Sequence, residues 1–188
     1  PSMTNEKNTY LLVDISGLLY RAFFSLGQLK SPTGEPTGAL YGFIKSFLKV
    51  VRQTGAQKIV AIFDGPRNKE SRLALYPEYK AHRKPTPDEL IHQIQEAKRF
   101  CTMWGMPLLS IPGVEADDVI ASVASWVQKK EHADVLICSH DKDLFQLLGP
   151  HTTLFNPSKE IFLSEESFTQ EWGITPKQSI DYLAIVGD

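Results

Sequence analysis

The chain has 188 residues, of which 42% are hydrophobic and 22% charged, with a formal net charge of −2. This length suits one domain, or one domain with part of a second, and the composition is that of a globular protein. No apolar run approaches the roughly 18 residues that a membrane-spanning helix needs. No charged segment followed by an apolar stretch opens the chain, so we expect neither a membrane anchor nor an export signal.

The small net charge conceals two oppositely charged halves. Residues 1–100 carry 15 Lys and Arg against 9 Asp and Glu, whereas residues 101–188 carry 5 against 13. A cationic surface beside an anionic pocket would explain this division, and chance unevenness is the alternative. The two cysteines, Cys101 and Cys138, form no zinc-binding pattern. We expect reduced thiols, although a disulfide between them stays open.

In chain order, the first elements alternate between strand and helix. An apolar run predicts a strand at 9–13, a mixed segment at 16–25 suits a helix, and 31–38 is a Pro- and Gly-rich loop. A helix is predicted at 39–53 and a buried strand at 58–63. The inward face predicted for that helix consists of Leu40, Phe43, Ile44, Phe47, Leu48 and Val51.

The second half continues the alternation. Thr86 is a candidate N-cap with Glu89 three residues later, as in a capping box, and the helix that follows ends before Gly105. Its predicted inward residues are Leu90, Ile91, Ile94, Ala97, Phe100 and Trp104. Strands are predicted at 106–110, 134–139, 152–155 and 160–163, and helices at 116–130, 164–172 and 175–188. Apolar strands alternating with helices predict an α/β fold with a mostly parallel central sheet.

Acidic residues follow several of the predicted strands. Asp14 ends the first strand, Asp64 follows the second, and Asp141 and Asp143 follow a later one. Because ligands of open α/β sheets bind at the carboxyl ends of the strands, we expect these acids to converge. A further group, residues 115–118 (EADD), opens a helix, where Glu115 and Asp118 would share a face.

Each acid has a simpler interpretation when taken alone. Acids in the first turn of a helix are favoured by the helix dipole, and Asp14 could be an ordinary turn residue. Taken together, however, converging carboxylates repel one another and are tolerated mainly when cations neutralise them. Oxygen-only ligands suit Mg²⁺ or Mn²⁺, and a pair of such ions can hydrolyse a phosphodiester.

A basic segment at 65–84 leaves directly from Asp64. It holds Arg67, Lys69, Arg72, Lys80, Arg83 and Lys84, interleaved with Tyr76 and Tyr79. Cations bind phosphates and aromatic rings stack on bases, so the segment suits single-stranded or frayed nucleic acid. A solvated charged loop is the alternative.

Six stretches carry a resemblance to a known family. They are LLVDISGLLYRAFF (11–24), GEPTGALYGF (34–43), VAIFDGP (60–66), YPEYKAHRKPTPDEL (76–90), GVEADDVIAS (113–122) and SHDKDLFQLL (139–148). In this order and spacing they resemble the 5′-nuclease (flap endonuclease) superfamily, most closely the N-terminal 5′-3′ exonuclease domain of bacterial DNA polymerase I. The resemblance implies a PIN-like three-layer α/β/α fold and two Mg²⁺ ions, for which Mn²⁺ can substitute.

The resemblance also implies roles for individual residues. The implied metal ligands are Asp14, Asp64, Glu115, Asp117, Asp118, Asp141, Asp143 and Asp188. The segment 72–84 resembles the helical arch of the family, in which Lys80 and Arg83 would act on the scissile phosphate. Further DNA contacts are implied for Arg21, Arg72, Tyr79 and Lys84. His140 stands where the family often has a small residue, and we interpret it as an incidental surface residue.

The family continues beyond the final Gly-Asp with Ser-Asp-Asn and a helix–hairpin–helix-like element that grips duplex DNA. We therefore expect residues 4–188 to be a catalytic domain that stops before this DNA-binding region, and residues 1–3 to be a tag remnant. The resemblance implies a monomeric enzyme of the bacterial cytoplasm that acts at the nucleoid. Its substrates would be DNA with a 5′ flap, nick or 5′ end, and RNA primers in replication and repair.

Two other functions stay open at this point. A related PIN-type ribonuclease would use the same metals on RNA, and nothing in the residues reads a 2′-hydroxyl. A non-catalytic DNA-binding module would bind flaps without turnover. A response-regulator-like fold also places Asp at strand ends, but it would not explain residues 115–118 or the basic segment.

Overall fold

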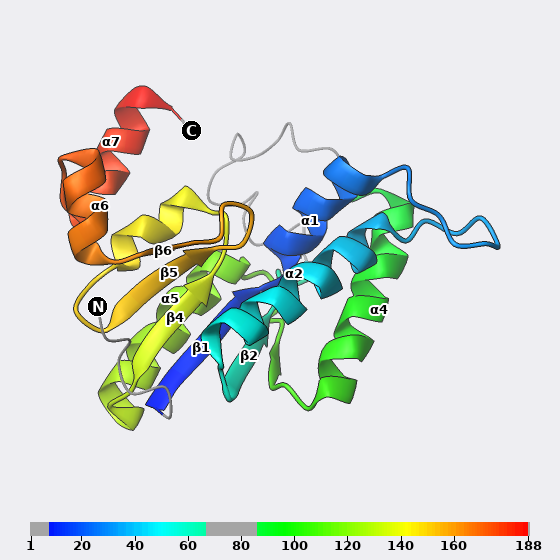
Figure 1. The fold of residues 1–188 in the computed structure, drawn as a ribbon, viewed down its shortest axis with the longest axis horizontal. Coiled ribbons are helices and arrows are strands. Elements are labelled where there is room, and N and C mark those ends of the chain that lie inside the picture. Colours follow the sequence, from blue (N-terminus) through cyan, green and yellow to red (C-terminus); the bar gives the residue numbers. More distant parts are fainter. Residues whose placement is uncertain (1–7, 67–85, 188) are drawn as a thin grey trace.

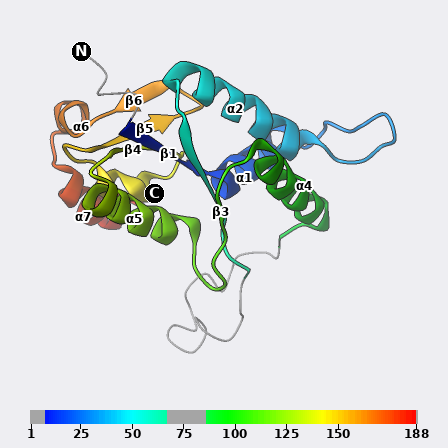
Figure 2. The ribbon, with the colours of Figure 1, turned by 90° about the horizontal axis from the view of Figure 1, so that it is seen from below.

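A computed structural model of the chain describes residues 8–66 and 86–187. At its centre is a six-stranded sheet in the order β3-β2-β1-β4-β5-β6, with helices on both faces (Figure 1 and Figure 2). The predicted three-layer α/β/α architecture with a mostly parallel sheet is therefore confirmed.

The order of the strands decides which residues meet at the edge of the sheet. The strands are β1 (Thr9–Asp14), β2 (Lys58–Ile62), β3 (Leu108–Leu109), β4 (Asp134–Cys138), β5 (Thr152–Asn156) and β6 (Ile161–Leu163). The first five are parallel, and β6 is antiparallel to β5. Strand β1 lies between β2 and β4. Because these three strands are parallel, the residues that follow them lie at the same edge.

The helices form two layers around this sheet. One face is covered by α1 (Ile15–Leu26), α2 (Gly38–Thr54) and α4 (Asp88–Trp104). The other is covered by α5 (Ala116–Trp126), the π-helix η2 (Val127–Glu131), the 3₁₀-helix η3 (Lys142–Leu147) and α6 (Glu165–Trp172). The 3₁₀-helix η4 (Pro176–Gln178) and α7 (Ser179–Val186) follow. No helix in the described part of the chain is both long and apolar enough to cross a membrane.

Burial on both faces explains the uninterrupted apolar runs of the strands. Along β1, Leu11 and Val13 pack into the layer of α1, α2 and α4, whereas Leu12 packs into the layer of α5. Successive strand residues point to opposite faces, so a strand between two helical layers needs apolar side chains at every position.

The buried face of α2 differs from the predicted one. The prediction that Leu48 faces the core is wrong, because its side chain is 39% exposed, whereas Phe43 and Phe47 are fully buried. The reason is a close contact between α1 and α2, where a Cβ on Gly42 would lie 2.5 Å from the Cβ of Ala22. Small residues contribute little to hydropathy, so the apolar pattern misplaces the centre of the buried face.

The inward face of α4 is also partly wrong. Ile91 and Trp104 are 44% and 46% exposed, and Gln93 and Cys101 are buried. The buried Gln93 is explained by its side-chain oxygen, which accepts a hydrogen bond from the Leu40 N–H in the first turn of α2 at 3.0 Å. A polar side chain that satisfies an unpaired helix N–H is stable in the core.

The predicted capping box at Thr86 is not formed. Helix α4 begins at Asp88 with Pro87 as its N-cap. The Thr86 hydroxyl instead hydrogen-bonds to the Tyr20 hydroxyl of α1 at 2.8 Å, which removes it from the helix terminus. The predicted opening of a last helix at Thr175-Pro176 is confirmed by a capping box, but its first turn is the 3₁₀-helix η4, and α7 follows and ends at Val186. The predicted cap at Ser164 is also confirmed with a capping box.

Both cysteines are free core residues. Cys101 and Cys138 are completely buried. Burial raises the pKa of the Cys101 thiol to about 12 and also raises that of Cys138, so neither side chain is a reactive thiolate.

We predict that Phe47→Ala lowers the free energy of unfolding by about 3–5 kcal/mol, because it removes a fully buried ring from the core. Leu48→Ala, one residue along α2, should cost less than about 1 kcal/mol because Leu48 is 39% exposed and lies outside the core. Urea denaturation of the two variants would measure the difference. Equal losses would contradict the buried face described for α2.

Candidate metal centre

The acids that end the strands lie at one edge of the sheet. Asp14 is the last residue of β1, Asp64 follows β2 by two residues, and Asp141 follows β4 by three. Since β2 and β4 are the two neighbours of β1, Asp14 occupies the middle of this edge.

Asp14 is buried and held by two hydrogen bonds. Its side chain is the N-cap of α1, where Oδ1 accepts the Gly17 N–H at 2.8 Å. Oδ2 accepts a hydrogen bond from the Ser139 hydroxyl, also at 2.8 Å. The Ser139 hydroxyl oxygen in turn accepts the Asp141 N–H at 3.1 Å, so a single serine connects two of the acids.

The electrostatic setting of Asp14 opposes its ionisation. Burial raises the pKa of this carboxyl from 3.8 to about 6. The hydrogen bonds from Gly17 and Ser139 act in the opposite direction, and the nearby charges of Asp64 and Asp141 raise the pKa further. A cation bound at this edge would offset both the burial and the repulsion.

Asp64 connects the end of β2 to the start of α5. Its Oδ1 accepts the N–H of Ala116, the first residue of α5, at 2.8 Å. Its own N–H donates to the Ser16 hydroxyl of α1 at 2.9 Å. The next residue, Gly65, packs against the backbone of Ile111, where an added Cβ would lie 1.6 Å from the carbonyl oxygen. This close approach brings the N-terminus of α5 to the acidic edge.

The EADD group opens α5, as predicted. Glu115 is the N-cap of this helix, with an extended backbone, and Ala116 is its first residue. That Glu115 and Asp118 share a face stays a prediction. Asp117 and Asp118 lie in the first turn, and the Asp118 N–H donates to Asp117 Oδ1 at 2.8 Å. Acids at this terminus also favour the helix dipole, so the simpler interpretation holds in part.

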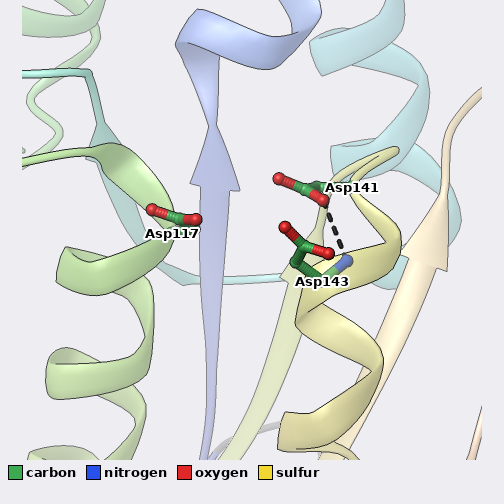
Figure 3. Close-up of side chains that lie close together, drawn as sticks. All are labelled: Asp117, Asp141 and Asp143. Carbon is green, nitrogen blue, oxygen red and sulfur yellow. Dashed lines mark hydrogen bonds between the residues drawn. The ribbon is translucent and has the colours of Figure 1, made fainter. Parts of the chain in front are cut away.

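Three carboxylates come close enough to hold one cation. An oxygen from each of Asp117, Asp141 and Asp143 lies within 4.8 Å of the others. Figure 3 shows Asp117 approaching from α5, and Asp141 and Asp143 from the start of η3. The Asp143 N–H donates to Asp141 Oδ1 at 2.9 Å, which fixes the pair. Among the described residues, no other trio of possible ligands is this compact, so Asp14, Asp64, Glu115 and Asp118 do not form a second such group.

The remaining predicted site residues are mostly outside the described ranges. Arg21 is exposed on α1. The residues that lie outside are Arg72, Tyr79, Lys80, Arg83, Lys84 and Asp188.

His140, interpreted from the sequence as an incidental surface residue, is partly buried. Its Nε2 is hydrogen-bonded to the Ser158 hydroxyl at 2.6 Å, in the turn between β5 and β6. Burial, and after it the charge of Arg21, lowers the pKa of the His140 ring to about 4. The ring is therefore neutral at physiological pH.

The sequence prediction also missed two residues that position Asp14. Gly17 stands three residues after an acid at a strand–helix junction, so its N–H is the expected partner of an N-cap side chain, and this spacing could have identified it. Ser139 has no comparable signal, because it lies 125 residues from Asp14.

A parallel sheet that gathers carboxylates at the ends of its central strands is typical of metal-dependent phosphodiesterases. A family model for the “5'-3' exonuclease, N-terminal resolvase-like domain” matches residues 9–173, and the chain belongs to this family.

Individual relatives agree with this assignment. The chain is 38% identical to a 5'-3' exonuclease of Aquifex aeolicus over 180 residues, which are 96% of this chain and 62% of that protein. It is 36% identical to the thermostable DNA polymerase I of Thermus thermophilus over 182 residues, 97% of this chain and 22% of the polymerase. The chain thus spans less than two thirds of the length of these relatives. The predicted resemblance to the exonuclease domain of DNA polymerase I is confirmed.

The fold is shared with a bacteriophage enzyme. The D15 flap endonuclease of bacteriophage T5, in a pseudo-enzyme-product complex with DNA and metal ions, superposes with a TM-score of 0.72. The match covers 96% of this chain and 66% of that one, at 19% sequence identity.

We predict that Asp14→Asn stabilises the metal-free protein at pH 7. Because the folded protein raises the pKa of this carboxyl from 3.8 to about 6, stability falls as the pH rises between these values and stays low above them. Asn keeps an acceptor for Gly17 and cannot ionise. We expect a gain of about 1–3 kcal/mol at pH 7 that disappears below about pH 4, measured by urea denaturation in EDTA. A variant no more stable than the parent at any pH would contradict this.

We predict that Gly17→Ala lowers the stability of the protein, because it disturbs the Asp14 side chain. An added Cβ would lie 2.4 Å from Asp14 Oδ2, so the side chain must move. Alanine favours a helix by about 1 kcal/mol, but we expect the clash to exceed this and to destabilise the protein by about 1–3 kcal/mol. Gly149→Ala is the matched control, because no atom lies within 4 Å of its added Cβ. A Gly17→Ala variant as stable as the parent would refute the tight fit.

Proposed function

We propose that the chain is the catalytic part of a divalent-metal-dependent 5′-3′ exonuclease and structure-specific 5′-flap endonuclease that hydrolyses DNA phosphodiester bonds. The observation that carries this proposal is the cluster of Asp117, Asp141 and Asp143 at the edge of the sheet. The names of the relatives support the reaction, and the flap endonuclease of similar fold contains DNA and metal ions.

The donor atoms fit Mg²⁺. Every group in the cluster is a carboxylate, and Mg²⁺ and Mn²⁺ prefer such oxygen ligands. We propose that Asp117, Asp141 and Asp143 hold one of two Mg²⁺ ions, for which Mn²⁺ can substitute. The other position would be served by Asp14, Asp64, Glu115, Asp118 and Asp188. Bound ions would supply a water of lowered pKa and neutralise charge on the leaving oxygen.

The protein contributes fixed positions for these carboxylates. Asp14 is held from both sides by Gly17 and Ser139, so it keeps its place whether or not a cation is bound. Because two of its lone pairs are already used, we expect it to act on a metal partly through bound water. Asp64 is anchored in the same way by Ala116.

The substrate contacts rest on the sequence resemblance. Lys80 and Arg83 would offset the charge on the attacked phosphate, and Arg21, Arg72, Tyr79 and Lys84 would bind the strand. We propose a monomer, with its catalytic domain within residues 4–188, that acts on 5′ flaps, nicks, 5′ ends and RNA primers at the bacterial nucleoid. The product would carry a 5′ phosphate.

The test is cleavage of a 5′-labelled flap DNA by this chain in Mg²⁺ or Mn²⁺. We predict cleavage near the junction that EDTA abolishes and that Asp141→Asn reduces by at least about 100-fold, since this removes a charged ligand. Asp134→Asn is the matched control at the opposite end of β4, where the amide oxygen can still accept from His151. It should leave the rate within about twofold.

Each outcome has a distinct meaning. Cleavage that survives Asp141→Asn and EDTA would exclude this metal site and indicate a contaminating nuclease. A ribonuclease would cut an RNA flap faster than the DNA flap. Tight flap binding without any turnover would favour the non-catalytic module.

A further inference from the structure

A pocket in the layer of α1 and α2 has a lining that suits an anion. It lies between α1, α2 and the turn that joins β5 and β6, and Figure 1 shows these three segments close together. Its polar lining includes Arg21, Ser25, Lys45, Lys49, His140 and Ser158. None of the described residues that line it is acidic, although the chain as a whole is slightly anionic.

Two of the cations at this pocket are available to a ligand. Lys49 is paired with Glu160, whereas neither Arg21 nor Lys45 has an ion-pair partner among residues 8–66 and 86–187. Lys45 and Lys49 are four residues apart on α2, so both lie on one helix face.

The His140 ring closes the pocket beside the candidate metal centre. Its Nε2 is hydrogen-bonded to Ser158, and its buried Nδ1 has no partner within the described part of the chain. Such unpaired buried groups are uncommon and usually need an explanation. His140 also stands between Ser139, which binds Asp14, and Asp141 of the carboxylate cluster. The loop after β4 therefore contributes one residue to the pocket and the next residue to the cluster.

The chemistry of the lining selects a phosphate oxygen. A guanidinium, an ammonium and hydroxyl groups are the donors that proteins use for nucleic-acid backbones. Among the described residues that line the pocket there is no Phe, Tyr or Trp, and the one ring is the imidazole of His140, which is hydrogen-bonded to Ser158. The pocket therefore suits the backbone of a strand better than a base.

We infer that this pocket binds a non-scissile phosphodiester of the DNA strand and so sets which bond reaches the carboxylate cluster. The inference rests on the proposed function and adds Lys45, His140 and Ser158 to the substrate-binding residues. Cations in the layer of α1 and α2 would position the strand, while the acids beside β1 act on the neighbouring bond.

The test compares DNA affinity in Ca²⁺ or EDTA, where cleavage does not interfere. Fluorescence anisotropy over a salt series would follow Lys45→Ala and Ser158→Asp, with Lys129→Ala as a matched control at the opposite edge of the sheet. We expect Lys45→Ala to weaken binding several-fold and to lower the slope of log K against log salt by about 0.7–0.9, the loss of one phosphate contact. Ser158→Asp should weaken binding at least tenfold, and Lys129→Ala should change neither quantity.

The product pattern gives a second readout. With Mg²⁺, Lys45→Ala should spread the cuts over neighbouring positions of the flap, because the register is less constrained. Unchanged affinity, slope and cut position in both pocket variants would overturn the inference. An equal loss in Lys129→Ala would also overturn it, since the effect would then be one of net charge.

Failure of the proposed function can be separated from failure of the pocket. If the parent chain cuts no DNA, the binding series still reports on the pocket. If it binds no DNA, titration with inorganic phosphate, followed by the NMR signals of the His140 ring, tests the site directly. A saturable shift that Ser158→Asp abolishes would support the anion site, and no shift would refute it.

Discussion

The burial of Asp14 is the constraint on which the site depends. A carboxylate that is only 8% exposed at the end of a central strand is costly to ionise, and the fold reduces this cost with two donated hydrogen bonds. One donor is the backbone N–H of Gly17, where an added Cβ would clash with Asp14. The other is the buried hydroxyl of Ser139, whose oxygen also accepts the N–H of Asp141. The junction of β1 with α1 and the loop after β4 are therefore fixed by the same side chain.

The neighbouring acids are positioned in the same way, through backbone groups. Asp64 accepts the first N–H of α5, and Asp141 accepts the N–H of Asp143. Backbone donors cannot move to another rotamer, so each carboxylate keeps its place while repelling the others. The edge is thus kept in an arrangement that would be unfavourable without cations, which is why stability and metal binding are expected to oppose one another at Asp14.

Sequence reasoning predicts those parts of this arrangement that depend on local pattern. Apolar runs bounded by acids were sufficient to place the strands and the acidic edge, because a parallel sheet brings strand ends together. The buried face of α2 was displaced, because its contact with α1 is made by Gly42 and Ala22 rather than by large apolar residues. Ser139 and His140 could not be assigned from sequence, because their partners lie far away in the chain or across a turn.

The unequal charge of the two halves of the chain acquires a physical meaning in the fold. The cations Arg21 and Lys45 come from α1 and α2, in one helical layer, whereas Asp117 and Asp143 come from α5 and η3, in the other. The end of β1 lies between the two layers, so a cationic pocket and an anionic cluster face the same edge from opposite sides. A polyanion could bind the cationic pocket first. It could approach the anionic cluster once cations neutralise the carboxylates. On the proposed function, this arrangement would allow a strand to be held before the metal centre is complete, so binding and cleavage could be measured separately.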